Sequence, residues 1–248
     1  MSEDYINEIK ALVRECGEYI LKADRSTMDV ESKWGSANFV TTYDKAVQEK
    51  LREGLARILP QARFVGEEGE GSPFSDEGLC FIVDPIDGTT NFIKDYHASC
   101  ISVGLIENGR ARAGVIYNPY LDEMFYAERG KGAYCNESKI TVSGNSLENG
   151  IVLFGSSPYN EELNEQSFTM AYDYFRRALD IRRSGSAALD LCSIAAGRAE
   201  LYFELRLSPW DYAAGALIVE EAGGVVKTID GKEISFDKPC SILAKNGV

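Results

Sequence analysis

The most informative part of this chain is one continuous stretch. It reads Phe81-Ile82-Val83-Asp84-Pro85-Ile86-Asp87-Gly88-Thr89-Thr90-Asn91-Phe92. The apolar run over 79–83 is typical of a short strand buried on both faces, so we predict that this strand carries Asp84 at its end. Pro85 then fixes a turn, and Asp87 follows at the next bend. Two carboxylates and the carbonyl of Ile86 therefore converge on one small volume, and hard cations such as Mg²⁺ prefer oxygen ligands of this kind.

The residues that follow Asp87 favour an anion. Gly88 allows the backbone to approach a ligand closely, and Thr89 and Thr90 begin a helix whose free N–H groups attract negative charge. For an isolated Asp-x-x-Asp-Gly pattern, the better explanation is a turn in which both aspartates cap backbone N–H groups. Here the length of the pattern and the acidic segments elsewhere in the chain favour a functional site.

Acidic side chains also stand at three other element ends. Glu67 and Glu68 follow a short apolar strand, while Asp44 and Asp211 lie in the first turns of two predicted helices. Asp44 and Asp211 each stand three residues after a threonine or a serine, which is the spacing of a helix-capping box. Taken singly, capping is the better explanation for these two, and Glu67 and Glu68 would fit a solvated loop.

The rest of the chain alternates between helical and extended patterns. Apolar spacing and turn residues predict helices over 4–24, 42–59, 161–177, 186–197 and 209–222, a strand meander over 98–142, and short strands near 151–155, 200–204 and 225–228. The turn-rich segment 143–150 predicts a seam. It divides an N-terminal α+β half (1–143), with most of the metal ligands, from a C-terminal α/β half (144–248), with both halves forming one compact catalytic unit of layered sheets and helices.

Composition and charge exclude several classes of protein. The net charge is −13, from 39 acidic and 26 basic residues, and such a surface repels nucleic acids and anionic membranes. We therefore predict neither as a partner. No apolar run approaches the roughly 18 residues of a membrane span, and the N-terminus lacks the features of a signal peptide, so we expect a cytoplasmic protein. The six cysteines form no Cys-x-x-Cys pair, which argues against a zinc site.

The chain has a single histidine, His97. A Ser-His-Asp triad, a phosphohistidine intermediate or a multi-histidine metal site would each require histidine at its centre. His97 follows a polar loop at the start of a predicted strand. We therefore interpret it as a structural or surface residue.

Taken together, these segments resemble the inositol monophosphatase family, within the lithium-sensitive, magnesium-dependent sugar-phosphatase superfamily. The resemblance covers nearly the whole chain, from Lys33 and 38–44 through 84–92 and 185–188 to Trp210-Asp211 and 220–224. The 84–92 string is highly specific, whereas the Gly-Ser-Ala stretch alone would be weak. The resemblance implies a layered α-β-α-β-α sandwich, which agrees with the element pattern.

The resemblance also implies a cluster of two or three Mg²⁺ ions. Glu67, Asp84 and the carbonyl of Ile86 would hold the first ion, and Asp84, Asp87 and Asp211 would hold the second. A third, weaker ion would use Glu67.

The remaining site residues follow from the resemblance in the same way. Thr89, hydrogen-bonded to Asp44, would help to activate the attacking water, and Glu67 would share in catalysis. Gly88 and Thr89 would hold the phosphate. The substrate's alcohol portion would face Gly185, Ser186, Ala187, Glu204 and Asp211.

The predicted function is therefore the Mg²⁺-dependent hydrolysis of a phosphate monoester of inositol or a similar sugar or polyol. A phosphate monoester dianion resists attack by a neutral or anionic nucleophile, and paired metal ions offset that charge. The family resemblance also implies inhibition by lithium and a homodimer.

Three alternatives remain within reach of the sequence. Fructose 1,6-bisphosphate and adenosine 3′,5′-bisphosphate are substrates of the same superfamily, and the loop Ile93–His97 departs from the family pattern near the predicted site. A non-catalytic interaction module that keeps the metal cluster is the alternative of another class, although the presence of both Thr89 and Asp44 favours an enzyme. An aspartyl-phosphate phosphatase is discounted because Asp84 and Asp87 are three residues apart rather than two.

Overall fold

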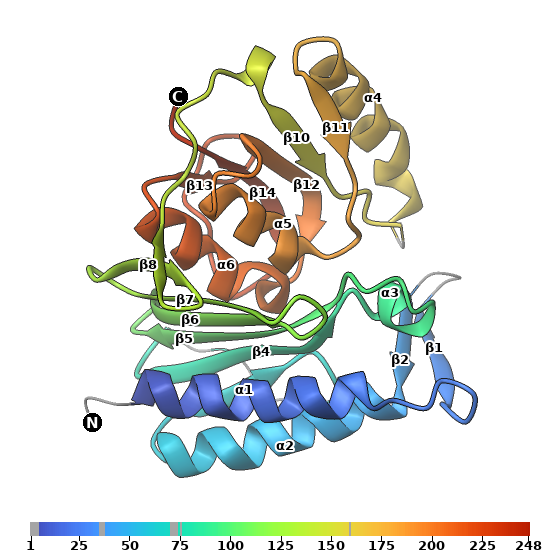
Figure 1. Cartoon of the computed structure of the whole chain (residues 1–248), viewed down its shortest axis with the longest axis vertical. Coiled ribbons are helices and arrows are strands. Elements are labelled where there is room, and N and C mark those ends of the chain that lie inside the picture. Colours follow the sequence, from blue (N-terminus) through green and yellow to red (C-terminus); the bar gives the residue numbers. More distant parts are fainter. Residues whose placement is uncertain (1–4, 35–37, 70–73, 75, 159) are drawn as a thin grey trace.

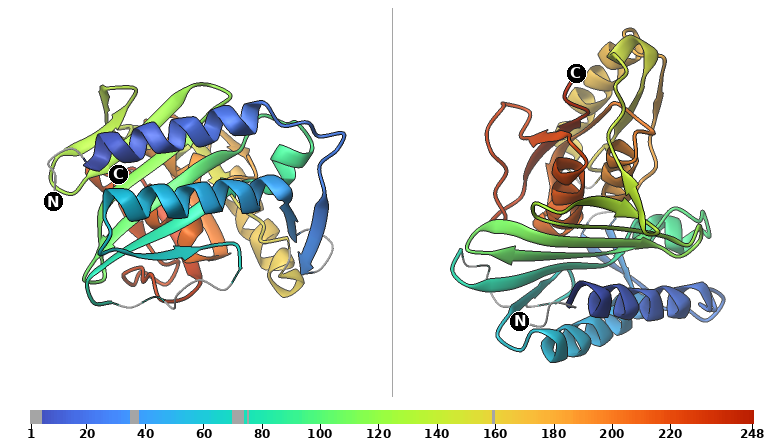
Figure 2. Two further views of the ribbon diagram at one scale, coloured as in Figure 1. Left: turned by 90° about the horizontal axis from the view of Figure 1, so that it is seen from below. Right: turned by 60° about the vertical axis from the view of Figure 1, so that its left-hand side comes forward.

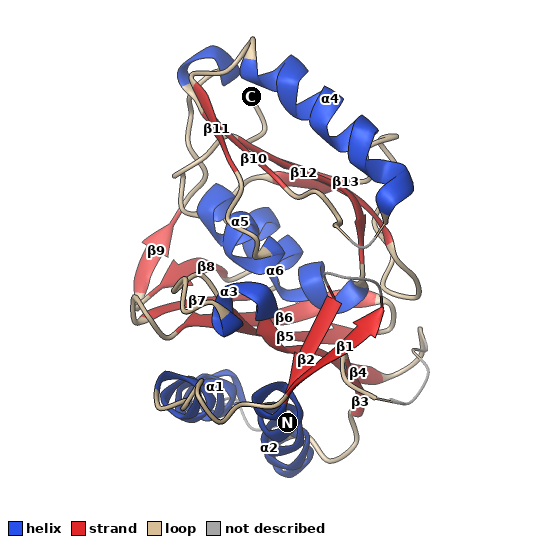
Figure 3. Cartoon of the chain, turned by 90° about the vertical axis from the view of Figure 1, so that its right-hand side faces the viewer, coloured by secondary structure: helices blue, strands red, loops and turns tan. Residues whose placement is uncertain are grey.

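The chain forms five alternating layers of helices and sheets (Figures 1 and 3). The computed structural model describes residues 5–34, 38–69, 74, 76–158 and 160–248. In order, the layers are a helix pair, a seven-stranded sheet, a second helix pair, a five-stranded sheet and one outer helix. The predicted α-β-α-β-α sandwich is confirmed.

The first layer consists of the amphipathic helices α1 (Tyr5–Leu21) and α2 (Thr42–Ile58), which lie side by side under the large sheet (Figure 2). Their apolar positions pack together, and Ile9 and Leu51 are almost completely buried. Burial of one apolar face explains why the three-and-four spacing predicted both helices. Residue 4, which the prediction included in the first helix, lies outside the described residues.

Two short strands that the sequence pattern did not predict precede α2. β1 (Val30–Trp34) and β2 (Asn38–Thr41) pair antiparallel, and β2 leads directly into the N-cap of α2. The backbones of Lys33 and Asn38 lie in this hairpin, but their side chains lie outside the described part of the chain.

The seven-stranded sheet has the order β3-β4-β5-β6-β7-β8-β9. Its strands are β3 (Arg63–Gly66), β4 (Leu79–Asp87), β5 (Cys100–Glu107), β6 (Arg110–Asn118), β7 (Glu123–Glu128), β8 (Gly132–Cys135) and β9 (Ser138–Ile140). β3 runs parallel to β4, and β4 to β9 form an antiparallel series. The predicted meander over 98–142 is therefore present.

The structure corrects the prediction that the strand ends at Asp84. β4 continues to Asp87, and its register with β5 shifts between Asp84 and Asp87. Proline cannot donate to the ladder, so Pro85 suits a bulge of this kind. Residues three apart on a regular strand would face opposite sides. The bulge brings both carboxylates to the same side.

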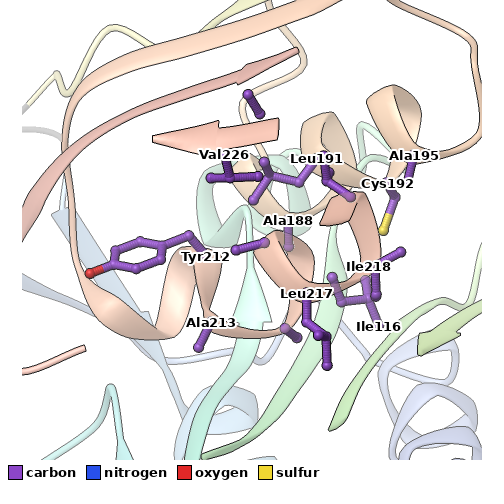
Figure 4. Close-up of a cluster of buried hydrophobic side chains, with 14 of the residues drawn as sticks. Ile116, Ala188, Leu191, Cys192, Ala195, Tyr212, Ala213, Leu217, Ile218 and Val226 are labelled. Atoms are coloured by element: carbon purple, nitrogen blue, oxygen red, sulfur yellow. The ribbon is translucent and has the colours of Figure 1, made fainter. Parts of the chain in front are cut away.

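The middle layer is formed by α5 (Ala187–Ala195) and α6 (Pro209–Glu221), which pack between the two sheets. Figure 4 shows Leu191 of α5 and Leu217 of α6 in this core, together with Ile116 of the large sheet. Because α6 is surrounded by other elements, it is apolar on nearly all sides. No helix in the described part of the chain is long and apolar enough to cross a membrane.

The five-stranded sheet has the order β11-β10-β12-β14-β13 and lies above the middle helices. Its strands are β10 (Ile151–Phe154), β11 (Asp180–Arg182), β12 (Leu201–Leu207), β13 (Val225–Lys227) and β14 (Cys240–Lys245). The outer helix α4 (Asn164–Phe175) covers its far face. The division of the chain into halves at 143 and 144 stays a prediction. The two halves are in contact, since α6 of the second half packs on the seven-stranded sheet of the first.

Candidate active site

A cavity of about 300 Å³ lies where β4, α5, β12 and the start of α6 meet. The short helix α3 (Thr89–Ile93) begins beside it. Of the predicted site residues, the cavity is lined by Glu67, Asp84, Ile86, Asp87, Gly88, Thr89, Gly185, Ser186, Ala187, Glu204 and Asp211. Asp44 does not line it but lies completely buried behind Thr89.

Three carboxylates form the centre of the cavity. Oxygen atoms of Asp84, Asp87 and Asp211 lie within 4.8 Å of one another. The β4 bulge supplies the first two, and the first turn of α6 supplies Asp211. Glu67, which directly follows β3, lines the same cavity without belonging to this group of three.

These acids are costly to ionise in the absence of a cation. Burial, followed by the charge of Glu67, raises the pKa of Asp84 well above its usual range. Burial and then the charge of Asp87 do the same to the pKa of Asp211. Burial likewise raises the pKa of Asp87 to about 6. Desolvation and mutual repulsion both disfavour the charged forms, and a bound cation would reverse both effects.

One oxygen of Asp87 is held by the start of α5. Its Oδ2 accepts hydrogen bonds from the Ser186 hydroxyl and from the Ala188 N–H (2.9 Å). These donors oppose the rise in the pKa of Asp87 that burial causes. Neither donor contacts Oδ1, so the carboxylate is oriented by one oxygen and can present the other to a ligand.

Asp44 contacts both the start of its own helix and Thr89. Its Oδ2 accepts from the Thr41 N–H (2.8 Å), and its own N–H donates to the Thr41 hydroxyl oxygen (3.3 Å), which forms the capping box of α2; the Thr41 hydroxyl also lies 2.5 Å from Oδ2. Its Oδ1 accepts from the Thr89 hydroxyl at 3.2 Å. The Thr89 oxygen also lies 3.1 Å from the carbonyl oxygen of Ile86, so one proton has two acceptors.

Asp211 also caps its helix. One carboxylate oxygen accepts from the N–H of Ser208 at 2.7 Å. The cap orients the carboxylate at the start of α6, and the same group lies beside Asp84 and Asp87. Capping and membership of the acidic cluster are therefore compatible.

The turn at Gly88 requires glycine. Gly88 has a φ of 84°, and an added Cβ would lie 2.9 Å from the carbonyl oxygen of Ala98. The neighbouring Asn91 donates to the carbonyls of Ala98 (2.7 Å) and Ser184 (2.9 Å). These bonds hold α3 against the segment that leads into α5.

Comparison with known proteins gives the family. The sequence pattern of the inositol monophosphatase family matches residues 1–248. The chain belongs to this family.

Three relatives align with this chain over most of their length. The inositol-1-monophosphatase of Bacillus subtilis is 36% identical over 244 residues, which cover 97% of this chain and 92% of that protein. Nus factor SuhB of Pasteurella multocida is 37% identical over 220 residues, which cover 88% of this chain and 82% of that protein. The solved structure of suppressor protein SuhB from Bartonella henselae superposes with a TM-score of 0.91 at 34% identity, covering 97% of this chain and 93% of that one.

In this family member, Glu204 is already engaged within the protein. Its Oε1 accepts from the N–H and hydroxyl of Ser157 (both 2.9 Å), and its Oε2 accepts from the hydroxyl of Tyr202 at 2.8 Å. Only 6% of Glu204 is exposed. A carboxylate has about four acceptor positions, so little capacity remains for substrate hydroxyls.

Three further polar residues that the sequence analysis did not single out line the cavity: Ser156, Arg183 and Asp190. Asp190 is an acidic residue in the mostly apolar sequence of α5, one turn after Ser186. An acid in a buried helix is a sign of a functional residue, so the sequence could have indicated it. Arg183 gave none, because it follows another arginine in a polar loop. Its Nε donates to the Ser156 hydroxyl (3.0 Å), and its two terminal amino groups have no acceptor among the described residues.

His97 lies outside the cavity. Its ring is exposed, stacks on Tyr120 at 4.8 Å and lies 3.2 Å from a carboxylate oxygen of Asp95. The structure supports its interpretation as a surface residue.

Proposed function

We propose that this family member is a Mg²⁺-dependent phosphatase that hydrolyses inositol monophosphate or a similar sugar or polyol phosphate. The observation that carries the proposal is the buried cluster of Asp84, Asp87 and Asp211 beside the Thr89–Asp44 pair. The carboxylates come from two separate segments, and Glu67 adds a third.

The donor set suits Mg²⁺. Every candidate ligand is a carboxylate or carbonyl oxygen, which hard divalent cations prefer over softer metals. Among the described residues that line the cavity, Arg183 is the only cation, against six carboxylates. We assign Glu67, Asp84, Ile86, Asp87 and Asp211 as the ligands of two or three ions. When bound, the ions supply charge neutralisation for the phosphate and a lower pKa for water.

The protein's own groups complete the proposed reaction. Of the two acceptors of the Thr89 proton, the proposal assigns Asp44, because the carbonyl of Ile86 would serve as a metal ligand; the Thr89 lone pairs can then accept from the attacking water. Asp44 is fixed by the capping box, so the acceptor is already oriented before substrate binds. Gly88 and Thr89 hold the phosphate, and the segment Gly185–Ala187 contacts the alcohol portion.

The preferred substrate is an inositol monophosphate, as in the named activity of the Bacillus relative. A sugar bisphosphate is the second candidate, because Arg183 offers two free amino groups at the cavity. Guanidinium groups bind phosphate oxygens in pairs. This arginine also offsets the charges of Glu204 and Asp190, which would otherwise repel a second phosphate.

The alternative to an enzyme is a non-catalytic interaction module that keeps the metal cluster for structural support. The relatives named Nus factor SuhB carry no enzyme name, so membership of the family does not establish turnover. The Thr89–Asp44 contact favours catalysis, since a merely structural cluster has no need of it. Inhibition by lithium, a cytoplasmic location and the absence of nucleic-acid partners stay predictions.

A phosphate-release assay separates these possibilities. The substrates are myo-inositol 1-phosphate, fructose 1,6-bisphosphate and adenosine 3′,5′-bisphosphate, each assayed with wild type, Arg183→Gln and the neighbouring control Arg182→Gln. We expect inositol phosphate to be best. We expect Arg183→Gln to lower kcat/KM for the sugar bisphosphate by about tenfold, the value of one charge-assisted hydrogen bond, with little effect on the monophosphate.

The outcomes are distinct. If the adenosine compound were best, the polyol assignment would be dropped and the phosphatase would stand. Equal effects of Arg182→Gln and Arg183→Gln would remove the role of Arg183. Hydrolysis of none of the three would support the non-catalytic alternative.

A further inference from the structure

The wall of the cavity that α5 forms contains a buried carboxylate that the proposed reaction does not use. Asp190 lies in the first turn of α5 and is 3% exposed. It follows Ser186 by four residues and Ala187 by three, so these side chains share one side of the helix, and all three line the cavity. Leu191 and Cys192 of the same helix belong to the apolar core (Figure 4). Asp190 is thus the acidic group on the side of α5 that faces the cavity.

The protein supplies few hydrogen bonds to this carboxylate. Among the described residues, the hydrogen-bonding neighbour of the Asp190 side chain is Ser184. The Ser184 hydroxyl also lies 3.1 Å from the carbonyl oxygen of Ser186, so its single proton has two acceptors. A carboxylate has about four acceptor positions. Asp190 therefore keeps most of its acceptor capacity, whereas three donors already bind Glu204.

Helix stability alone does not explain this buried acid. A negative charge in the first turn of α5 gains from the helix dipole, but that gain is small beside the cost of burying a carboxylate that has few donors. Burial is the largest cause of the raised pKa of Asp190. Aspartate is rarely buried this completely unless it is paired. A ligand that donates hydrogen bonds to Asp190 would offset this cost.

Hydrogen-bond donors lie near Asp190 in the same cavity. The Ser156 hydroxyl oxygen accepts from Nε of Arg183 at 3.0 Å, and the Ser156 proton has no acceptor among the described residues. The positive charge of Arg183 opposes the rise in the pKa of Asp190, so the two groups are close enough to interact. This part of the cavity therefore offers both an acceptor and donors to a ligand.

We propose that Asp190, Ser156 and Arg183 form a subsite that binds two neighbouring hydroxyl groups of the substrate. An alcohol hydroxyl both donates and accepts, so each can donate to Asp190 and accept from Ser156 or Arg183. We call these three residues the diol subsite. The substrate class is a phosphate monoester of a polyol with a free diol, such as an inositol ring. A phosphate in place of this diol would offer acceptors only, and Asp190 would repel it.

The inference rests on the proposed phosphatase function and changes one assignment within it. The family resemblance implies that Glu204 faces the alcohol portion. The diol subsite assigns hydroxyl recognition to Asp190, because the acceptor positions of Glu204 are largely filled by the protein. Glu204 then has a positioning role in the wall of the cavity.

Two substrates that differ in their hydroxyl groups test the subsite. myo-Inositol 1-phosphate and cyclohexyl phosphate share a six-membered carbon ring, but the second has no hydroxyl. The measured quantity is the ratio of their kcat/KM values for one enzyme preparation, which does not depend on the fraction of folded protein. We expect Asp190→Asn to lower this ratio by about tenfold or more, the value of one hydrogen bond to a charged group. The loss should lie mainly in KM for the inositol phosphate, because the ring hydroxyls do not react.

Two further acid-to-amide changes serve as controls. Glu200 is 5% exposed, does not line the cavity and accepts from the side chains of Ser143 and Asn145. Glu200→Gln should leave the ratio at the wild-type value. Glu204→Gln disturbs a carboxylate that three donors fix, so it should lower both kcat/KM values together.

The possible results separate the subsite from the reaction. A wild-type ratio in Asp190→Asn, or a larger fall in the ratio for Glu204→Gln than for Asp190→Asn, would overturn the diol subsite while the phosphatase function stands. Failure of the wild type to hydrolyse either substrate with Mg²⁺ would overturn the proposed function, and the subsite with it.

Discussion

At Thr89, a single hydroxyl has two acceptors, the carboxylate of Asp44 and the carbonyl of Ile86. The capping box holds Asp44 in place, so helix stability and the orientation of Thr89 depend on one side chain. A sequence can suggest a cap at Asp44 from its spacing to Thr41. It cannot show that the second oxygen faces Thr89, because that contact joins residues 45 positions apart.

Thr89 and Asp44 should therefore act as a unit in turnover. Thr89→Ala and Asp44→Asn should each lower kcat by about a hundredfold or more, and the double variant should be little worse than the poorer single. Groups that work in one network give non-additive losses. Strictly additive losses in the four-member kinetic cycle would assign Asp44 to capping alone.

Site residues were easiest to predict where acidic side chains stand in a specific sequence pattern at the end of an element. The 84–92 string, Glu67 and Asp211 were all singled out, and the structure brings them to one cavity. Arg183 and Ser156 were missed because they meet only after β10 and the segment before α5 are brought together in the fold. Local spacing carries no signal for such contacts.

At the element scale, amphipathic helices were predictable and short strands were not. α1, α2 and α6 have boundaries within a few residues of the predicted ones, because each has a periodic face or clear capping residues. β11 and β14 were missed. β11 is a three-residue strand at the edge of its sheet, and β14, which lies between β12 and β13, is defined only by its pairing with these neighbours. The bulge in β4 was read as a strand end, although Pro85 marked its place.

The bulge in β4 should be required for Mg²⁺ binding, because it sets the side of the strand that Asp87 faces. Insertion of one alanine between Asp84 and Pro85 should change which side of β4 the Asp87 carboxylate faces, because side chains alternate along a strand. We expect loss of detectable Mg²⁺ binding by isothermal titration calorimetry, with native circular dichroism retained. The control is the same insertion in the exposed turn at Gly130, which should keep binding. Equal Mg²⁺ affinity in both insertion variants would contradict the role of the bulge.

At the scale of the whole molecule, the acidic cluster should oppose folding when no cation is bound. Burial raises the pKa of Asp87 from 3.8 to about 6, so the native state holds this proton more tightly than the unfolded chain. The resulting contribution to stability is present below about pH 4 and is lost as pH rises through about 6. The metal-free protein should lose stability across that window.

Thermal unfolding in EDTA measures this effect. Asp87→Asn removes the titrating group, so the Tm of the variant minus that of wild type should increase from pH 4 to pH 7. Saturating Mg²⁺ should abolish the trend by stabilising the ionised wild type. If the Tm difference in EDTA were independent of pH, ionisation of Asp87 would not be the cause of the lost stability.

The most direct test of the central claim is phosphate release from myo-inositol 1-phosphate by wild type, Asp84→Asn and His97→Ala, each with Mg²⁺ and with excess EDTA. We predict that EDTA abolishes turnover, that Asp84→Asn loses on the order of a thousandfold, several kcal/mol of barrier, and that His97→Ala keeps nearly full activity. Calorimetry on the same samples should show weaker Mg²⁺ binding by Asp84→Asn only. Full turnover by wild type in EDTA, or an Asp84→Asn variant as active as His97→Ala, would contradict the account.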